Sequence, residues 1–234
     1  MARLLIVGVY LADKPNTIKH IYHQFEVTSQ HHVEQRWVAI NAAKAESATI
    51  PETYLVLDNP LPKFTILNQL TLDALDFDWV IIADDDIELD DSFLDNYITL
   101  CERYDFALSQ PSRTSDSYMD HSFVEAMPGL LARRTRFVEI GPLVCIRRDA
   151  MDLILPFDSD VGMGWGLDFI WPLLIEGANL KMGIIDASPI AHRIRPPVSM
   201  YNRTTAIKQM SVLLAKKKYL LAKEAFTILE VYRS

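Results

Sequence analysis

Residues 79–86 read WVIIADDD, an apolar run that ends abruptly in Asp84, Asp85 and Asp86. A short apolar run without polar alternation is typical of a strand buried on both faces, as in a parallel sheet covered by helices. Three adjacent carboxylates repel one another and gain nothing from burial, so we expect a cation beside them. Open α/β sheets bind ligands at the carboxyl ends of their strands. This stretch therefore predicts a cation site at one edge of an α/β sheet.

The residues on either side of this strand predict an alternation of strands and helices. Strands are expected over 3–9, 36–41, 54–57, 106–109, 137–146 and 181–185. Helices are expected over 17–27, 64–75, 90–104, 148–155 and 167–177, with a mostly helical tail over 204–233. Residues 111–134 are expected to form a long functional loop. The alternation in the first half predicts a parallel sheet.

Composition and charge narrow the class of protein. The chain has 234 residues, half of them hydrophobic, and a net charge of −8. This composition predicts one globular domain over 1–234, and the negative charge argues against a nucleic-acid partner. No apolar segment approaches the roughly 20 residues of a membrane span. Cys101 and Cys145 have no metal or redox spacing, so we expect reduced thiols in a cytoplasmic protein.

Asp84 and Asp86 are two residues apart, so in an extended segment their side chains share one face. Carboxylates in this arrangement suit Mg²⁺ or Mn²⁺. A calcium loop fits poorly, because Leu89 stands where such a loop needs Gly. A phosphatase with an aspartyl nucleophile is an alternative, although Glu88 stands where its motif usually has Thr or Val. The alternative with no metal-binding or catalytic role is a solvated acidic loop that caps the next helix.

Two further motifs lie downstream. GMGWGLD, residues 162–168, places Trp165 between glycines as a flat platform for a sugar ring, with Asp168 beside it as a candidate general base. A glycine-rich turn with a core Trp and a helix-capping Asp is the alternative. His192 follows the last predicted strand and suits Mn²⁺, whereas a lone His is more often structural or solvated. Arg193 and Arg195 would meet a diphosphate.

In this order the motifs resemble the GT-A superfamily of nucleotide-sugar-dependent glycosyltransferases. The resemblance implies a Rossmann-like α/β/α sandwich of three layers around a mostly parallel sheet. The three aspartates look like the DXD motif, which in that family holds a divalent metal against the donor diphosphate. By this resemblance Asp84, Asp86 and His192 hold the metal. GMGWGLD is similar to the acceptor motif of inverting galactosyltransferase-type enzymes, so Trp165 and Gly166 would border the acceptor.

A closer likeness is to a glycosyltransferase-like family best known from plants. It rests on SQP (109–111), FVEIGPLVCIRRDA (137–150), GWGLD (164–168) and the spacing from Ile184 to His192. Glu139, in the second segment, is assigned to the acceptor by this likeness, and Lys63 resembles a donor-side lysine. Many superfamily members carry a second acid after GWG, whereas Phe169 follows Asp168 here, so the catalytic base rests on one carboxylate.

Together these features predict a metal-dependent glycosyltransferase that uses Mn²⁺ or Mg²⁺ and inverts the transferred sugar. The donor would be a nucleoside-diphosphate sugar, a UDP-sugar first, and the acceptor a hydroxyl of a glycan or another molecule. Residues 1–110 are expected to bind the donor, 111–203 the acceptor and metal, and 204–234 to form a C-terminal helix. The donor-side residues are Tyr10, Asn41, Lys63, Asp84, Asp85, Arg193 and Arg195.

Several alternatives stay open at this point. Tyr10 and Asn41 end the first two predicted strands and are as well explained as ordinary strand ends. The alternative functions are those of a related nucleotidyltransferase, of a sugar phosphatase, or of a non-catalytic protein that binds a sugar or a nucleotide. The tail mixes apolar residues with Lys216, Lys217, Lys218 and Lys223, which suits the inner face of an anionic membrane. A terminal helix packed on the domain with a solvated basic face is the alternative.

Overall fold

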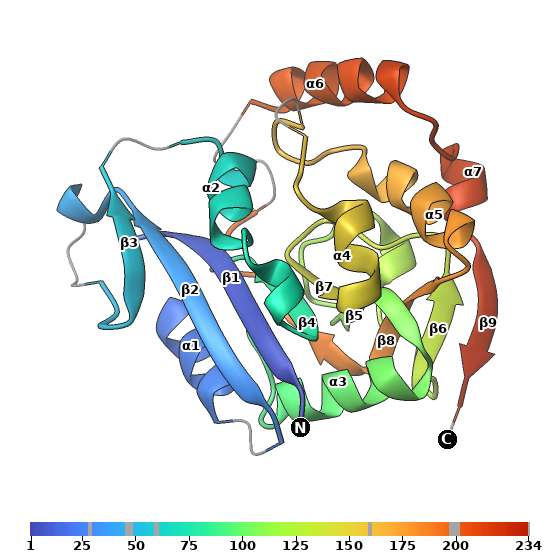
Figure 1. Cartoon of the computed structure of the whole chain (residues 1–234), viewed down its shortest axis with the longest axis horizontal. Coiled ribbons are helices and arrows are strands. Elements are labelled where there is room, and N and C mark those ends of the chain that lie inside the picture. The colour runs from blue at the N-terminus through green and yellow to red at the C-terminus, as the bar shows by residue number, and fades with distance from the viewer. Residues whose placement is uncertain (28–29, 45–48, 59–60, 159–160, 197–201, 234) are drawn as a thin grey trace.

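The computed structural model describes residues 1–27, 30–44, 49–58, 61–158, 161–196 and 202–233. Within them one nine-stranded sheet runs through the molecule in the order β3-β2-β1-β4-β7-β5-β8-β6-β9, with helices on both sides (Figure 1). The strands are β1 (Arg3–Leu11), β2 (His32–Ile40), β3 (Thr53–Leu57), β4 (Trp79–Ala83), β5 (Phe106–Arg113), β6 (Ala132–Thr135), β7 (Leu143–Arg147), β8 (Lys181–Ile190) and β9 (Ile228–Tyr232). The α-helices are α1 (Ile18–Glu26), α2 (Lys63–Leu70), α3 (Phe93–Arg103), α4 (Arg148–Ile154), α5 (Leu167–Gly177), α6 (Arg203–Lys216) and α7 (Ala222–Ala225).

The N-terminal half of the sheet is parallel, as the sequence predicts. β1 pairs in parallel with β2 and β4, and β2 pairs in parallel with β3. All five residues of β4 are buried, which agrees with its unbroken apolar sequence. Gly8 of β1 stands opposite Ala83 of β4. The residues that follow these two strands therefore meet at one edge of the sheet.

β7 enters the sheet antiparallel, between β4 and β5. Its first residue, Leu143, stands opposite Ala83, the last residue of β4. The segment that leads into β7 therefore runs beside Asp84, whose backbone N–H donates to the Pro142 carbonyl oxygen at 2.7 Å. β6 is also antiparallel to both of its neighbours. Mostly parallel pairing thus holds for the N-terminal half, and the other half is mixed.

Several predicted elements differ from the structure. The strand expected over 137–146 forms only at β7, because Pro142 has no amide hydrogen to donate to a ladder. The loop expected over 111–134 contains the end of β5 and part of β6. The helical tail predicted over 204–234 contains α6 and α7 but then forms β9, which pairs with β6. The sequence of β9, ILEVY, is rich in residues that favour strands.

Two apolar cores fill the space between the sheet and its helices, which gives the three layers. One core joins the sheet to α2, α4, α5 and α6, and the other joins it to α1 and α3. Cys101 and Cys145 are buried free thiols in the second core, as predicted. Among the described residues, no helix is long and apolar enough to cross a lipid bilayer.

Candidate active site

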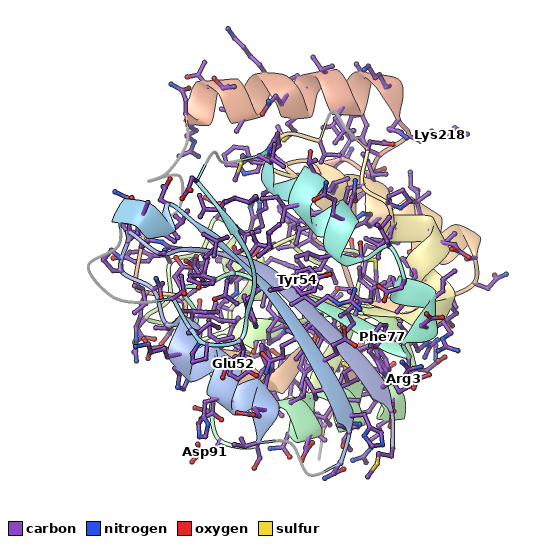
Figure 2. All side chains as sticks on the ribbon, turned by 60° about the vertical axis from the view of Figure 1, so that its left-hand side comes forward. Arg3, Glu52, Tyr54, Phe77, Asp91 and Lys218 are labelled. Atoms are coloured by element: carbon purple, nitrogen blue, oxygen red, sulfur yellow. The ribbon has the colours of Figure 1, made fainter. Side chains whose placement is uncertain are left out.

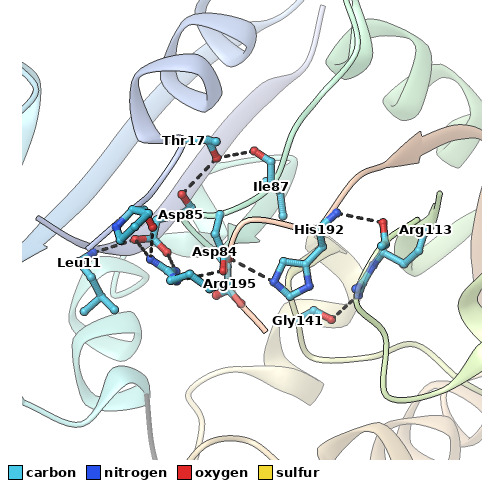
Figure 3. Close-up of polar contacts among 12 residues, drawn as sticks. Leu11, Thr17, Asp84, Asp85, Ile87, Arg113, Gly141, His192 and Arg195 are labelled. Carbon is cyan, nitrogen blue, oxygen red and sulfur yellow. Dashed lines mark hydrogen bonds and ion pairs between the residues drawn. The ribbon is translucent and has the colours of Figure 1, made fainter. Parts of the chain in front are cut away.

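The three aspartates after β4 are bound by cationic side chains from distant parts of the chain. Lys63, the first residue of α2, bonds Asp84 through its Nζ. Arg195 bonds the carboxylate of Asp85, and its Nε lies 3.1 Å from Asp86 Oδ2. Figure 3 shows Arg195 beside Asp84 and Asp85 at the end of β4. The structure thus brings together Lys63, Arg195 and the acidic cluster, as the sequence predicts.

These contacts set the charges in the cluster. Burial opposes the positive charge of Lys63, but the neighbouring Asp84 outweighs burial and raises the Lys63 pKa. Burial also raises the pKa of Asp85, against the influence of Arg195. Burial works in the same direction on Asp86, but His192 and Arg195 outweigh it and lower the Asp86 pKa. The cluster therefore pairs its carboxylates with protein cations, which resolves the repulsion expected from the sequence.

Asp86 and His192 fit a divalent metal as a pair of ligands. Two cis ligands of an octahedral ion, each about 2.1 Å from it, lie roughly 3 Å apart, and His192 Nε2 is 3.3 Å from Asp86 Oδ1. Among the described residues, no group of three or more His, Cys, Asp or Glu side chains could hold a metal ion. Asp84 instead faces Lys63. The remaining ligands of an ion here would come from phosphate oxygens and water.

A cavity of about 410 Å³ lies at the end of β1, in the half of the chain that the sequence analysis predicts to bind the donor. Its wall includes Tyr10, whose hydroxyl lies 2.6 Å from Thr53 Oγ1. Thr17, also in the wall, donates through Oγ1 to the backbone oxygens of Asp85 and Ile87 (Figure 3). Asp85 also accepts the Leu11 backbone N–H at 2.8 Å. Asp85 therefore turns from Asp84 toward this cavity wall, as the alternation of side chains predicts.

Two predicted donor residues are placed elsewhere. Asn41 donates through Nδ2 to Asp13 Oδ1 at 3.2 Å, and it is not among the described residues that line the 410 Å³ cavity. Arg193 is exposed and paired with Glu88 at 2.7 Å and with Asp116. None of its contacts among the described residues reaches the three aspartates. The structure therefore does not bring Arg193 to the predicted diphosphate site.

Asp168 occupies the first turn of α5, directly after the glycine-rich loop. Gly166 caps this helix with a φ of 97°, a conformation that suits glycine. The Asp168 side chain is buried, and its Oδ1 has no hydrogen-bond partner among the described residues. Burial raises the pKa of Asp168 to about 7, although backbone groups of Gly166 and Phe169 favour its charged form. A buried carboxyl with an unused oxygen is equipped to take a proton.

Arg113 is a site residue that the sequence prediction missed. It lies near the end of β5 and is buried. One of its terminal nitrogens donates to Glu139 Oε2 at 2.9 Å and to the Gly141 carbonyl oxygen at 2.6 Å (Figure 3). Asp84 and Asp86 also favour its charge. The sequence analysis assigned Arg113 to a loop, where its charge would be solvated. In a buried strand the same charge needs an acidic partner, and this was the signal that could have identified it.

Glu139 is the acidic partner of Arg113 and couples it to Asp168. Burial raises the Glu139 pKa to about 7, Arg113 works against this rise, and the charge of Asp168 adds to it. The Glu139 backbone N–H donates to Gln110 Oε1 at 2.5 Å. Asp84 and Asp86 therefore lie close enough to act on Arg113, and Asp168 lies close enough to act on Glu139.

Close packing brings the glycine-rich loop to the acidic cluster. Gly164 has a φ of 84°, and a Cβ placed there would lie 2.5 Å from the Phe64 ring and 3.1 Å from Ile140. Phe64 is the neighbour of Lys63 on α2. A Cβ on Gly141 would lie 3.2 Å from Asp84 Oδ2. The loop, the first turn of α2 and the segment before β7 therefore pack against one another beside Asp84 and form one continuous wall.

Comparison with known proteins supports the fold and leaves the family open. No family model matches the chain, and no curated protein sequence matches it. The structure is similar to that of GalNAc-T7 with UDP, GalNAc and Mn²⁺, with a TM-score of 0.60 and 10% identity, covering 92% of this chain and 48% of that one. It is also similar to S. aureus TarS 1–349 with UDP, with a TM-score of 0.52 and 11% identity, covering 96% and 68%.

The same TarS region with UDP-GlcNAc gives a TM-score of 0.52, 12% identity and coverage of 96% and 69%. This chain thus spans about half of the GalNAc-T7 chain. At these identities the likeness shows the fold alone. The predicted GT-A fold, a mixed α/β structure around a large central sheet, is confirmed. The likeness to the plant family stays a prediction.

Proposed function

We propose that this chain is a nucleotide-sugar glycosyltransferase that binds its donor diphosphate at Asp84–Asp86 and its acceptor hydroxyl at Asp168. The observation that carries the proposal is the Asp168 carboxyl, buried with an oxygen that has no partner among the described residues, and close enough to Glu139, the partner of Arg113, to raise its pKa. A general base works best when its pKa lies near the operating pH, and burial raises that of Asp168 to about 7. The nucleotides in the similar structures support a UDP-sugar as the first donor to test.

The reaction follows from this placement as a direct displacement with inversion. Asp168 removes the proton of the acceptor hydroxyl while that oxygen attacks the anomeric carbon of the donor. Trp165 offers its indole face to the acceptor sugar, beside Gly166 and Glu139. Arg195 and Lys63 lend positive charge to the departing diphosphate, and Mn²⁺ or Mg²⁺ on Asp86 and His192 would supply more. The Tyr10 cavity would receive the base and ribose.

Donor binding is tested by thermal shift with UDP, with and without Mn²⁺. A ligand at one hundred times its Kd stabilises the folded state by about 2.7 kcal/mol, which corresponds to roughly 5–10 °C in Tm for a chain of this size. We expect this shift with UDP and Mn²⁺ together, and its loss in Asp86→Asn. Asp91→Asn, an exposed acid at the far end of the molecule from α6 (Figure 2), is the matched control.

Three outcomes would contradict parts of the proposal. No shift with any of several nucleoside diphosphates, with Mn²⁺ or Mg²⁺, would remove the donor site. Donor binding without transfer or donor hydrolysis across a broad acceptor screen would point to a binding protein. Phosphate release from a sugar phosphate without nucleotide would point to a phosphatase.

A further inference from the structure

Positive charge is concentrated in one segment of this acidic chain. Residues 203–224 hold six of its 23 lysines and arginines and one of its 31 acidic residues, so they carry +5 in a chain of net charge −8. The remainder of the chain therefore carries −13. The segment comprises α6, the loop after it and most of α7. Its basic residues are Arg203, Lys208, Lys216, Lys217, Lys218 and Lys223.

The same segment exposes apolar side chains among its lysines. Tyr219 and Leu221, directly after the lysine run, are 42% and 50% exposed, and Val212 on α6 is 52% exposed. Figure 2 shows Lys218 at the outer edge of the molecule, beyond the end of α6. A lysine run followed by exposed Tyr and Leu suits the interface of a bilayer, where the rings and apolar side chains enter the headgroup region and the charges meet lipid phosphates.

The basic segment rests on the helix that carries Asp168. The Leu220 backbone N–H donates to the Phe169 carbonyl oxygen at 2.9 Å. A Cβ on Gly166 would lie 3.0 Å from Met210 and 3.3 Å from Leu214, both on α6. Lys217 is tied to Asp158 at 2.9 Å, which anchors the loop to the body. The segment therefore holds a fixed place beside the start of α5.

We propose that residues 203–224 dock this chain on an anionic lipid bilayer. The positive charge of the segment favours an anionic surface, and the exposed Tyr219 and Leu221 favour a bilayer interface. The charge distribution also sets the orientation, because the rest of the chain is acidic and is repelled by the same surface. Docking through α6 and the loop places the first turn of α5 next to the bilayer. Resting on the proposed function, this orientation favours acceptor hydroxyls carried by molecules attached to that membrane.

Flotation with phosphatidylcholine vesicles, with or without phosphatidylglycerol, tests the docking. We expect the chain to float only with the anionic vesicles. Each lysine neutralised near the surface lowers affinity about five-fold, so Lys218→Gln costs about five-fold and Lys218→Gln with Lys223→Gln about 25-fold. Arg103→Gln removes an exposed charge from α3, on the opposite side of the molecule from α6 (Figure 1), and leaves binding unchanged.

Apolar contacts are tested in the same assay. Tyr219→Ser with Leu221→Ser lowers binding, whereas Leu72→Ser, at a side chain 86% exposed, does not. Unchanged melting temperatures show that the variants are folded. The proposal is overturned if the chain does not float with anionic vesicles, or if the lysine variants and the Tyr219 variant bind as well as the wild type. An acidic protein would then be the partner that the charge fits. The assay contains no nucleotide, so flotation without transfer activity would defeat only the proposed function.

Discussion

Replacing Asp168 with Asn changes stability in a way that depends on pH. Burial raises the pKa of Asp168 to about 7 from its ordinary 3.8, so ionising it costs more in the folded chain than in the unfolded one. This cost appears above pH 3.8, grows with pH, and levels off above pH 7. Asn cannot ionise, so the Asp168→Asn variant has no such ionisation cost at any pH. We therefore expect Asp168→Asn to gain stability over the wild type as pH rises.

The size of the effect follows from the two pKa values. The ionisation cost in the wild type is about 2 kcal/mol at pH 5 and about 4 kcal/mol at pH 8, using 1.36 kcal/mol per pKa unit. The stability effect of Asp168→Asn should therefore differ by about 2–3 kcal/mol between pH 5 and pH 8. Any effect of the substitution that does not depend on pH cancels in this difference. The Asp168→Asn substitution also ends the repulsion that raises the Glu139 pKa, which adds to the gain in the same direction.

Urea denaturation of both proteins at pH 5 and pH 8 measures this difference directly. Asp91→Asn, at an exposed acid, is the control. Transfer activity of Asp168→Asn should fall by about 10²- to 10⁴-fold, as for a lost general base, while UDP affinity stays the same. A stability change that is equal at the two pH values would refute the raised pKa and, with it, the choice of Asp168 as the base.

Two further substitutions test the close packing of the wall and the pairing of Arg113 with Glu139. Gly164→Ala should lose about 2 kcal/mol or more in urea denaturation, because its φ is 84° and the new Cβ would lie 2.5 Å from the Phe64 ring. Gly177→Ala, where a Cβ meets nothing within 4 Å, should stay within about 1 kcal/mol of the wild type. Arg113→Met leaves Glu139 without its cation, so the Glu139 pKa should rise above about 7 and stability should fall by about 3 kcal/mol above that pH. The loss should shrink at pH 5, where Glu139 is protonated, and an equal loss at both pH values would contradict the pairing.

The parts of the site that the sequence predicted have local signals. The bounds of α5 match the prediction: glycines precede the helix and Gly177 is its last residue, although the left-handed residue that follows the helix is Asn179 and not a glycine. β4 was predicted from its apolar run alone. Asp86 and His192 meet, although far apart in sequence, because Glu88 and Ala191 form a bridge that aligns the segments after β4 and β8. The rule that ligands bind at strand ends captured this convergence.

The parts that the sequence missed depend on which strands pair. Nothing local in residues 228–232 shows that they will add to β6, and nothing near Arg113 shows that its strand continues past Pro111 to reach Glu139. Arg193 has a simpler explanation. Neighbouring residues of an extended segment point to opposite sides, so when His192 faces Asp86, Arg193 faces Glu88 and Asp116.

The position of β7 has a consequence for how this protein can be divided. β4 and β5 follow one another in the chain but are neighbours only through β7, and the predicted division between 110 and 111 falls inside β5. A fragment ending at 110 would leave β4 as an open sheet edge, with its aspartates lacking both the Pro142 carbonyl oxygen and Arg195. The halves predicted to bind donor and acceptor are thus two sides of one folding unit, so a chimera that exchanges one half would also have to rebuild the middle of the sheet.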